Sequence, residues 1–160
     1  LEPRTPAARR VGVMAQISKY LRNVAGGGLS FWCQGCREAH VVWIAGQGPE
    51  DGRPRWSWNG DVERPVFTPS VLVRSYRYPN PYEPDNNPEH AEIRAKFEHA
   101  GAAGHDRRMD HPKWGRRFHS FVGCNGAQPG EIIFLGDCTH ELAGSVQALA
   151  ELPPHLSREA

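Results

Sequence analysis

The chain of 160 residues has no long hydrophobic run, no marked excess of one charge sign and few cysteines. No stretch approaches the roughly 20 apolar residues that a membrane-spanning helix needs, so we expect a soluble protein with no membrane partner. Lys and Arg number 19 against 18 Asp and Glu, for a net charge of +1. This balance excludes a polycation that binds nucleic acid by overall charge alone.

Heptads, internal repeats and a phosphate-binding glycine loop are also absent, because the glycines at 26–28 have no accompanying lysine. Four cysteines would suffice for two disulfides. A C-x-x-C pair seldom bridges to itself structurally, however, and the amino terminus lacks an apolar signal with a cleavage site. We therefore expect reduced thiols in the cytoplasm of a bacterial host cell, with the virion as an alternative location.

Glycine (17) and proline (14) are frequent and scattered, a pattern that favours short strands joined by many turns. The length fits one domain with a real hydrophobic core. We predict a disordered arm over residues 1–13, a single zinc-binding domain over 14–153 with an insertion at 78–117, and a tail over 154–160.

Two helices are predicted in this domain. The apolar residues Val13, Ile17, Leu21 and Val24 fall at helical spacing, so an amphipathic helix is expected over 13–24. A second helix is expected over 88–100 within the insertion, with Asn87 as its N-cap.

The remaining elements are predicted to be strands. Apolar, β-branched and aromatic runs flank the C-x-x-C turn at 29–33 and 39–44. Further strands are expected before Asn59 and at 66–73, 118–122, 131–135 and 145–149, the 66–73 strand being limited to an edge or a bulge by Pro65 and Pro69. The fold class is therefore mostly β with a minor α component, a small sandwich or open barrel with a zinc knuckle, one amino-terminal helix and one inserted helix.

The strongest chemical signal is a set of potential metal ligands. Cys33 and Cys36 are separated by two residues, which lets both sulfurs meet one cation. Cys138 and His140 lie two apart, so on an extended segment they project to the same face. We predict a Zn²⁺ site formed by Cys33, Cys36, Cys138 and His140. The alternative ligands are His119 and His40, and the alternative interpretation is a redox pair or buried thiols.

A closed shell of three cysteines and one histidine leaves no coordination position for water, so such zinc is structural. An open position would instead allow zinc-bound water to act, with Asp137 or Glu38 as general base. Ser120 stands beside His119, but adjacent strand residues point to opposite faces, so we discount the two as a nucleophile and base.

Several segments resemble a known family. They are Phe31-Trp32-Cys33-x-x-Cys36-x-x-x-His40, Trp58-Asn59-Gly60-Asp61, Arg64-Pro65-x-Phe67-Thr68-Pro69-Ser70-x-Leu72-Val73, His119-Ser120-Phe121-Val122 and Phe134-Leu135-Gly136-Asp137-Cys138-Thr139-His140-x-Leu142-Ala143-Gly144. Together they resemble short phage and prophage proteins often mislabelled ammonia monooxygenase. The resemblance implies a phage or prophage origin and a zinc site, but no established activity. It also places a cysteine where this chain has Phe118, so that position supplies no ligand here.

The leading prediction for function is a phage-encoded binding module that is not an enzyme and whose structural zinc supports contact with a protein or nucleic-acid partner. Most of the five tryptophans are expected in the core, with exposed platforms for stacking bases as the alternative for some of them. A basic stretch between residues 94 and 117 is the feature that would contact phosphates. The alternatives are a zinc-dependent hydrolase with a metal-bound water and a virion structural protein. The oligomeric state is left open.

Overall fold

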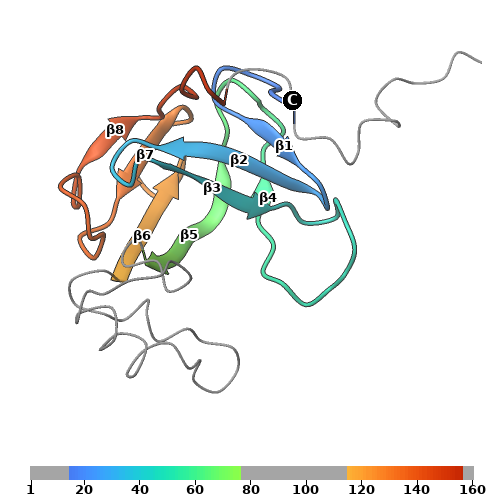
Figure 1. Ribbon diagram of the computed structural model, residues 1–160, viewed down its shortest axis with the longest axis horizontal. Helices are drawn as coiled ribbons and strands as arrows, with labels where there is room; N and C mark the ends of the chain where they lie inside the picture. Colours follow the sequence, from blue (N-terminus) through green and yellow to red (C-terminus); the bar gives the residue numbers. More distant parts are fainter. Residues whose placement is uncertain (1–14, 77–114, 157–160) are drawn as a thin grey trace, which may run out of the picture.

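The computed structural model describes residues 15–76 and 115–156, which form two antiparallel sheets (Figure 1). The first sheet has the strand order β1-β2-β3 and the second the order β4-β5-β6-β7-β8. The strands of the first are β1 (Arg22–Val24), β2 (Gly28–Cys33) and β3 (Glu38–Trp43). Those of the second are β4 (Ser57–Trp58), β5 (Phe67–Tyr76), β6 (Gly115–Val122), β7 (Glu131–Phe134) and β8 (Val146–Ala148). The mostly β prediction is confirmed for these residues.

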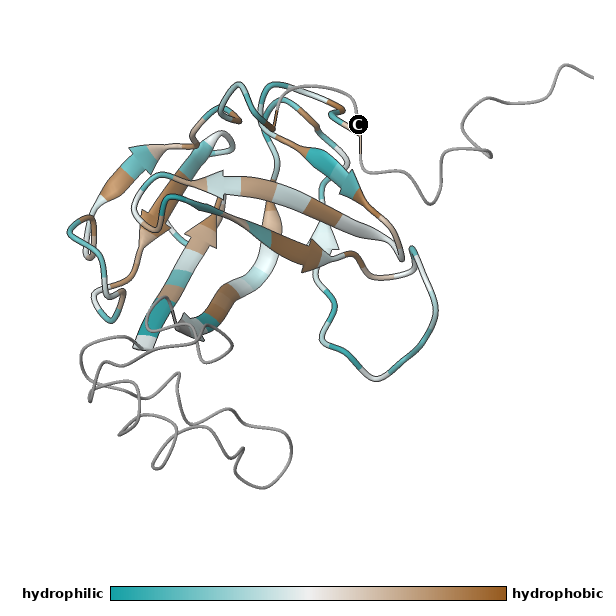
Figure 2. Cartoon of the chain, viewed as in Figure 1, coloured by the Kyte–Doolittle hydropathy of each residue, from teal (hydrophilic) through white to brown (hydrophobic). Residues whose placement is uncertain are grey.

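The two sheets pack against each other through aromatic side chains. The ring centroid of Phe31 on β2 lies 6.1 Å from that of Phe67 on β5 and 5.9 Å from that of Phe118 on β6. All three side chains are buried, and Phe134 on β7 continues the cluster. Hydrophobic residues alternate with paler, more polar ones along β2 in Figure 2, as expected for a strand with one face in a core. These aromatic contacts join β2 of the first sheet to β5 and β6 of the second sheet.

The predicted amino-terminal helix is wrong over its described part, residues 15–24. The segment instead curls back on itself, with a hydrogen bond of 2.8 Å from the Asn23 N–H to the Ala15 carbonyl, and ends in β1. Val24 pairs with Gly28 across a turn in which Gly26 and Gly27 have φ values of 93° and 89°. Because glycine adopts these angles without strain, the chain reverses there and strand pairing overrides the helical pattern.

The predicted strands are otherwise confirmed with small changes in length, and the expected bulge falls at Pro69. Phe67 pairs with Val122, yet the next pair is Val71 with Ser120, so two extra residues are accommodated on β5. Proline supplies no N–H to a ladder, which explains why the irregularity lies here. β5 is not an edge strand, since the two-residue β4 covers its other side.

Several predictions lie outside the described residues, namely the arm at 1–13, the helix at 88–100 and most of the insertion at 78–117. Over residues 15–76 and 115–156 there are no helices, and hence none with the length and hydropathy needed to cross a bilayer.

Candidate functional site

A serine, a histidine and an aspartate form a continuous hydrogen-bonded chain on the second sheet. The His119 Nδ1 atom lies 3.1 Å from both Asp137 Oδ1 and Asp137 Oδ2. On the other side of the same ring, Nε2 lies 3.3 Å from Ser70 Oγ. This is the geometry of a serine nucleophile, a general base and an orienting carboxylate.

Each member of this triad comes from a different element. Ser70 lies in the bulge of β5, His119 lies near the middle of β6, and Asp137 lies in the turn that follows β7. His119 pairs in register with Leu72, which places Ser70 diagonally across on the same face of the sheet. The pairing of β5 with β6 therefore determines which serine meets the histidine.

The Asp137 carboxylate determines the tautomer of the His119 ring. A carboxylate at Nδ1 accepts a hydrogen bond and so holds the ring proton there, which leaves Nε2 free to accept the Ser70 hydroxyl proton. Arg117 Nη1 lies 3.9 Å from Asp137 Oδ2, and both side chains are 43% exposed. The His119 side chain is 26% exposed, so the triad is accessible from solvent.

The neighbouring serine in the sequence is not part of this chain. Ser120 is fully buried, on the face of β6 opposite His119, and its Oγ has no hydrogen-bond partner among the described residues. The argument that adjacent strand residues diverge is thus confirmed. Sequence reasoning missed Ser70, because the segment 68–70 gives no signal for a nucleophile until the strand register is known.

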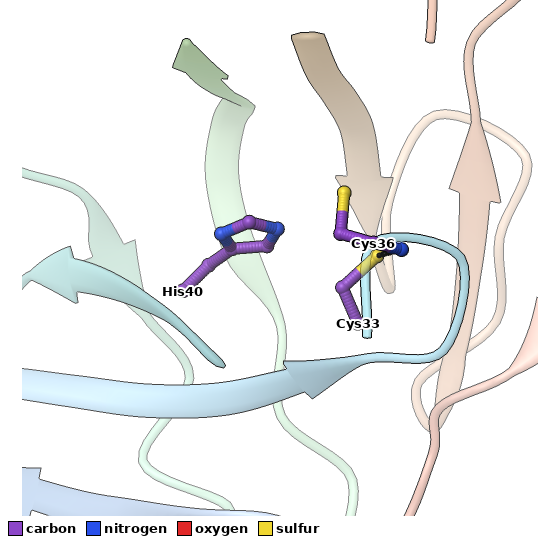
Figure 3. A group of neighbouring side chains, drawn as sticks. All are labelled: Cys33, Cys36 and His40. Carbon is purple, nitrogen blue, oxygen red and sulfur yellow. Dashed lines mark hydrogen bonds between the residues drawn. The ribbon is translucent and has the colours of Figure 1, made fainter. Parts of the chain in front are cut away.

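A second cluster, the knuckle cluster, consists of Cys33, Cys36 and His40 (Figure 3). Their ligand atoms all lie within 4.8 Å of one another, all three side chains are buried, and the His40 ring points toward the two cysteines. Cys33 ends β2 and His40 lies on β3, so the hairpin brings the three together. This cluster could bind a metal ion.

Electrostatics within the knuckle cluster distinguish its two thiols. The pKa of Cys33 is lowered from 9.0 because its thiolate accepts hydrogen bonds from the Cys36 side chain and backbone, although burial opposes this. The pKa of Cys36 is raised, first by that same hydrogen bond to Cys33 and then by burial. A thiolate at Cys33 is the form that binds a metal.

The His40 ring is almost completely buried from solvent. The side chain is 3% exposed, its ring lies 4.2 Å from that of Phe118, and Nε2 has no hydrogen-bond partner among the described residues. A buried ring nitrogen without a partner costs free energy, and a metal ion would relieve that cost.

The other predicted ligands lie beside this cluster. His140 Nε2 lies 3.8 Å from Cys33 Sγ, and the ring covers Gly35, where a Cβ would come within 2.4 Å of it. Cys138 Sγ lies 3.3 Å from the His119 nitrogen and 3.1 Å from the His119 carbonyl oxygen. Burial raises the pKa of Cys138, whereas burial followed by the Arg116 charge lowers that of His140.

The remaining candidates occupy other places. His119, an alternative ligand, has both ring nitrogens engaged in the triad. Glu38, a predicted general base, begins β3 and pairs in register with Cys33. Asp137, the other predicted base, contacts His119 and orients it. Cys33, Cys36 and His40 thus lie together in the knuckle cluster, whereas Asp137 and His119 lie in the triad with Ser70.

Comparison with known proteins identifies the family. Neither the curated proteins nor the solved structures contain a significant match to this chain. A family model described as "Bacterial ubiquitination-like system serine protease (BubE)" matches residues 6–128, a stretch that includes Ser70, His119 and the knuckle cluster and ends before Asp137.

This match corrects the identification with phage and prophage proteins, which was wrong. It also corrects the prediction of a binding module that is not an enzyme, together with its zinc-hydrolase and virion alternatives, because the matched family is one of serine proteases. Since the model covers more than half of the chain, the protein belongs to the BubE family of serine proteases of bacterial ubiquitination-like systems.

Proposed function

We propose that this protein is a serine peptidase in which Ser70 is the nucleophile, His119 the general base and Asp137 the residue that orients His119. The observation that carries the proposal is the single imidazole bridging Ser70 Oγ at 3.3 Å and the Asp137 carboxylate at 3.1 Å. The family to which the chain belongs supports the same reaction class.

The reaction follows from this geometry. His119 Nε2 takes the proton from Ser70 Oγ as the oxygen attacks the carbonyl carbon of an amide bond. Asp137 stabilises the resulting imidazolium. The His119 imidazolium then gives its proton to the leaving amine as the carbon–nitrogen bond breaks. Water hydrolyses the acyl-enzyme in a second cycle, with His119 again acting as base.

The surroundings of the triad suit a polypeptide substrate. Leu72 pairs with His119 on the same face as Ser70 and is 47% exposed, which provides an apolar contact beside the nucleophile. The family description points to a substrate from a bacterial ubiquitination-like system. We propose an amide bond that joins a ubiquitin-like modifier to its target or to its own precursor segment.

A fluorophosphonate probe tests the nucleophile, because it reacts with activated serines independently of the natural substrate. The full chain is incubated with the probe, and the modified residue is located by peptide mass spectrometry. We expect one adduct at Ser70 that is lost in Ser70→Ala. Ser57→Ala, a change at an exposed serine on the adjacent strand β4, should be labelled like the unmodified protein. Labelling at another serine, or none, contradicts the proposal.

We also propose that the knuckle cluster binds Zn²⁺ as a structural ion. Two thiols and an imidazole are ligands that zinc prefers over hard cations. The Nε2 atom of buried His40, which has no hydrogen-bond partner within residues 15–76 and 115–156, and the lowered pKa of Cys33 support a bound cation. Elemental analysis of the purified full chain should give one zinc per molecule, and Cys33→Ser should abolish it. A zinc-free protein with unchanged stability on zinc addition contradicts this proposal.

A further inference from the structure

Leu72 directs its main-chain hydrogen-bonding groups toward the outer edge of β5. Its partner on β6 is His119, whose main chain is bonded on the side away from β5. The His119 carbonyl accepts a hydrogen bond of 2.9 Å from the Leu135 N–H, and the His119 N–H lies 3.3 Å from Cys138 Sγ. Opposite residues of an antiparallel pair either bond each other or both point their N–H and C=O outward. The N–H and C=O of Leu72 therefore point away from β6.

The main chain of Ser70 supports this direction. The Ser70 carbonyl accepts a hydrogen bond of 3.0 Å from the indole N–H of Trp56, which directly precedes β4. Carbonyls two residues apart on an extended chain point to the same side, so the Leu72 carbonyl faces this side too. However, β4 pairs only with Phe67 and Thr68. In the part of the chain that the structure describes, no strand pairs with Leu72 on the outer side of β5.

The chain that precedes β4 leaves β5 and joins the first sheet. The Trp56 N–H donates to the Trp43 carbonyl at 2.7 Å, and the Trp56 carbonyl accepts from the Ala45 N–H at 2.8 Å. The segment that would extend β4 beside Leu72 therefore pairs next to the end of β3 instead. As a result, the outer edge of β5 is covered as far as Ser70 and open at Leu72, as judged from the described residues.

This open edge position lies beside the nucleophile and on the side opposite the base. Ser70 Oγ contacts His119 Nε2 on β6, whereas the Leu72 N–H and C=O lie on the other side of β5, two residues further along. Extended peptides add to exposed sheet edges through main-chain hydrogen bonds. A substrate chain along this edge would bring its carbonyl to Ser70 without displacing His119.

We propose that the substrate segment on the acyl side of the scissile bond binds as an added antiparallel strand on the outer edge of β5, paired with Leu72. The inference rests on the proposed peptidase function and describes how that site holds its substrate. With the first residue before the scissile bond opposite Ser70, the third residue before it lies opposite Leu72. This third residue donates its N–H to the Leu72 carbonyl and accepts a hydrogen bond from the Leu72 N–H.

The direction of the added strand follows from what borders the edge. In a parallel arrangement, the acyl segment would run past Trp56, which already occupies the outer side at Ser70. In the antiparallel arrangement only the leaving amine lies toward Trp56. The acyl part of the proposed substrate is the main chain of a modifier, whereas its amine can belong to a lysine side chain or to a precursor segment. Pairing through the acyl part therefore suits both kinds of amide bond.

Peptidyl phosphonates with single N-methyl groups test the register. The probe is acetyl-tetraalanine diphenyl phosphonate, in which phosphorus replaces the scissile carbonyl carbon. Ser70 Oγ forms a bond to phosphorus, and phenol leaves with the serine proton. N-methylation of the third residue before the bond should slow labelling at least about tenfold, because it removes the hydrogen bond to the Leu72 carbonyl. N-methylation of the second residue, whose N–H points away from β5, is the matched control and should leave the rate unchanged.

Equal rates for the two N-methylated probes, or a larger loss at the second residue, overturn the proposed pairing. Failure of the parent probe to modify a protein whose Ser70 reacts with a fluorophosphonate also overturns it, while the peptidase function stands. If the fluorophosphonate does not label Ser70 either, the peptidase function is contradicted and the pairing with it.

Hydrogen exchange followed by NMR observes the edge directly in the unmodified full chain. In the free protein, the Leu72 amide should exchange at least about tenfold faster than the Val73 amide, which faces β6. Labelling of Ser70 with the tetraalanine probe should slow exchange at Leu72 at least about tenfold, whereas a fluorophosphonate that carries no peptide should not. A Leu72 amide that is protected before labelling, or still unprotected after it, overturns the proposal.

Discussion

Ser70 and His119 face each other across two neighbouring antiparallel strands, with Oγ and Nε2 3.3 Å apart. The two residues are far apart in the sequence. Ser70 lies within the bulge of β5, between Phe67 and Val71. The position of the proposed nucleophile therefore depends on a local irregularity of a strand whose residues from Val71 onward pair regularly with β6.

Substitutions of His119 and Asp137 should distinguish the contribution of the base from that of the residue that orients it. His119→Ala removes the base and should abolish detectable fluorophosphonate labelling of Ser70. Asp137→Asn keeps the shape of the side chain but favours the wrong imidazole tautomer, so labelling should slow by a factor of about 10³ to 10⁴. Rates of adduct formation followed by intact-protein mass spectrometry provide the measurement.

The control for Asp137 is Arg117→Gln. Its guanidinium lies 3.9 Å from the carboxylate in an exposed pair, and such pairs contribute roughly 0 to 1 kcal/mol. We expect a change in labelling rate of less than about tenfold, since 1.4 kcal/mol corresponds to a factor of ten. A loss as large as that of Asp137→Asn would mean that the Asp137 carboxylate orients His119 only when Arg117 holds it in place.

Two tryptophans test how the nucleophile is oriented. The Trp56 indole N–H donates to the Ser70 carbonyl at 3.0 Å, whereas the buried Trp58 indole nitrogen has no hydrogen-bond partner among the described residues. Trp56→Phe should cost about 0.5 to 1.5 kcal/mol of the free energy of unfolding and slow Ser70 labelling severalfold. Trp58→Phe removes no bond, so its labelling rate should not change.

Denaturant unfolding monitored by tyrosine and tryptophan fluorescence gives the stability of both variants. If Trp58→Phe slows labelling as much as Trp56→Phe, the hydrogen bond to Ser70 does not orient the nucleophile.

The sequence predicted the sheet-forming segments better than it predicted the site. The runs on either side of Cys33 and Cys36 alternate and are bounded by turn residues, which is local information, and they became β2 and β3. The helical spacing of Ile17 and Leu21 was equally local, but pairing with β2 across the glycine turn outweighed it. Local patterns thus failed where a long-range pairing competed with them.

The triad could not be predicted for the same reason. Which serine meets His119 is decided by the register of β5 on β6, and a shift of one residue would turn Ser70 to the opposite face. The spacing of Cys33 and Cys36 was sufficient to predict that they share a metal site. The pairing of Phe31 with His40 in the hairpin brings His40 to the same cluster.

Removal of zinc should lower stability without a change in covalent structure. Zinc that binds only the folded state adds about 2.7 kcal/mol when its free concentration is 100 times the dissociation constant. Full chain treated with a strong chelator should therefore melt at a lower temperature by circular dichroism, and added zinc should restore the transition. Cys33→Ser should melt like the chelated protein and not respond to zinc, whereas Cys124→Ser should respond fully.

Gly35 offers a steric test of the contact between the knuckle and the turn that follows β7. A Cβ at this position would come within 2.4 Å of the His140 ring, so Gly35→Ala must displace the imidazole or the knuckle. Overpacking of this kind costs about 1 to 3 kcal/mol. We expect a lower free energy of unfolding and weaker zinc binding, measured by denaturant unfolding and by competition with a chromophoric chelator.

Gly136→Ala is the matched control, because a Cβ there meets nothing within 4 Å and the residue directly precedes Asp137. Its stability and zinc affinity should equal those of the unmodified protein. Equal behaviour of the two alanine variants would mean that His140 moves away from Gly35 at no cost, and the ring would then not support Cys33. A loss confined to Gly35→Ala would instead tie the zinc site to the segment that also presents Asp137 to the catalytic histidine.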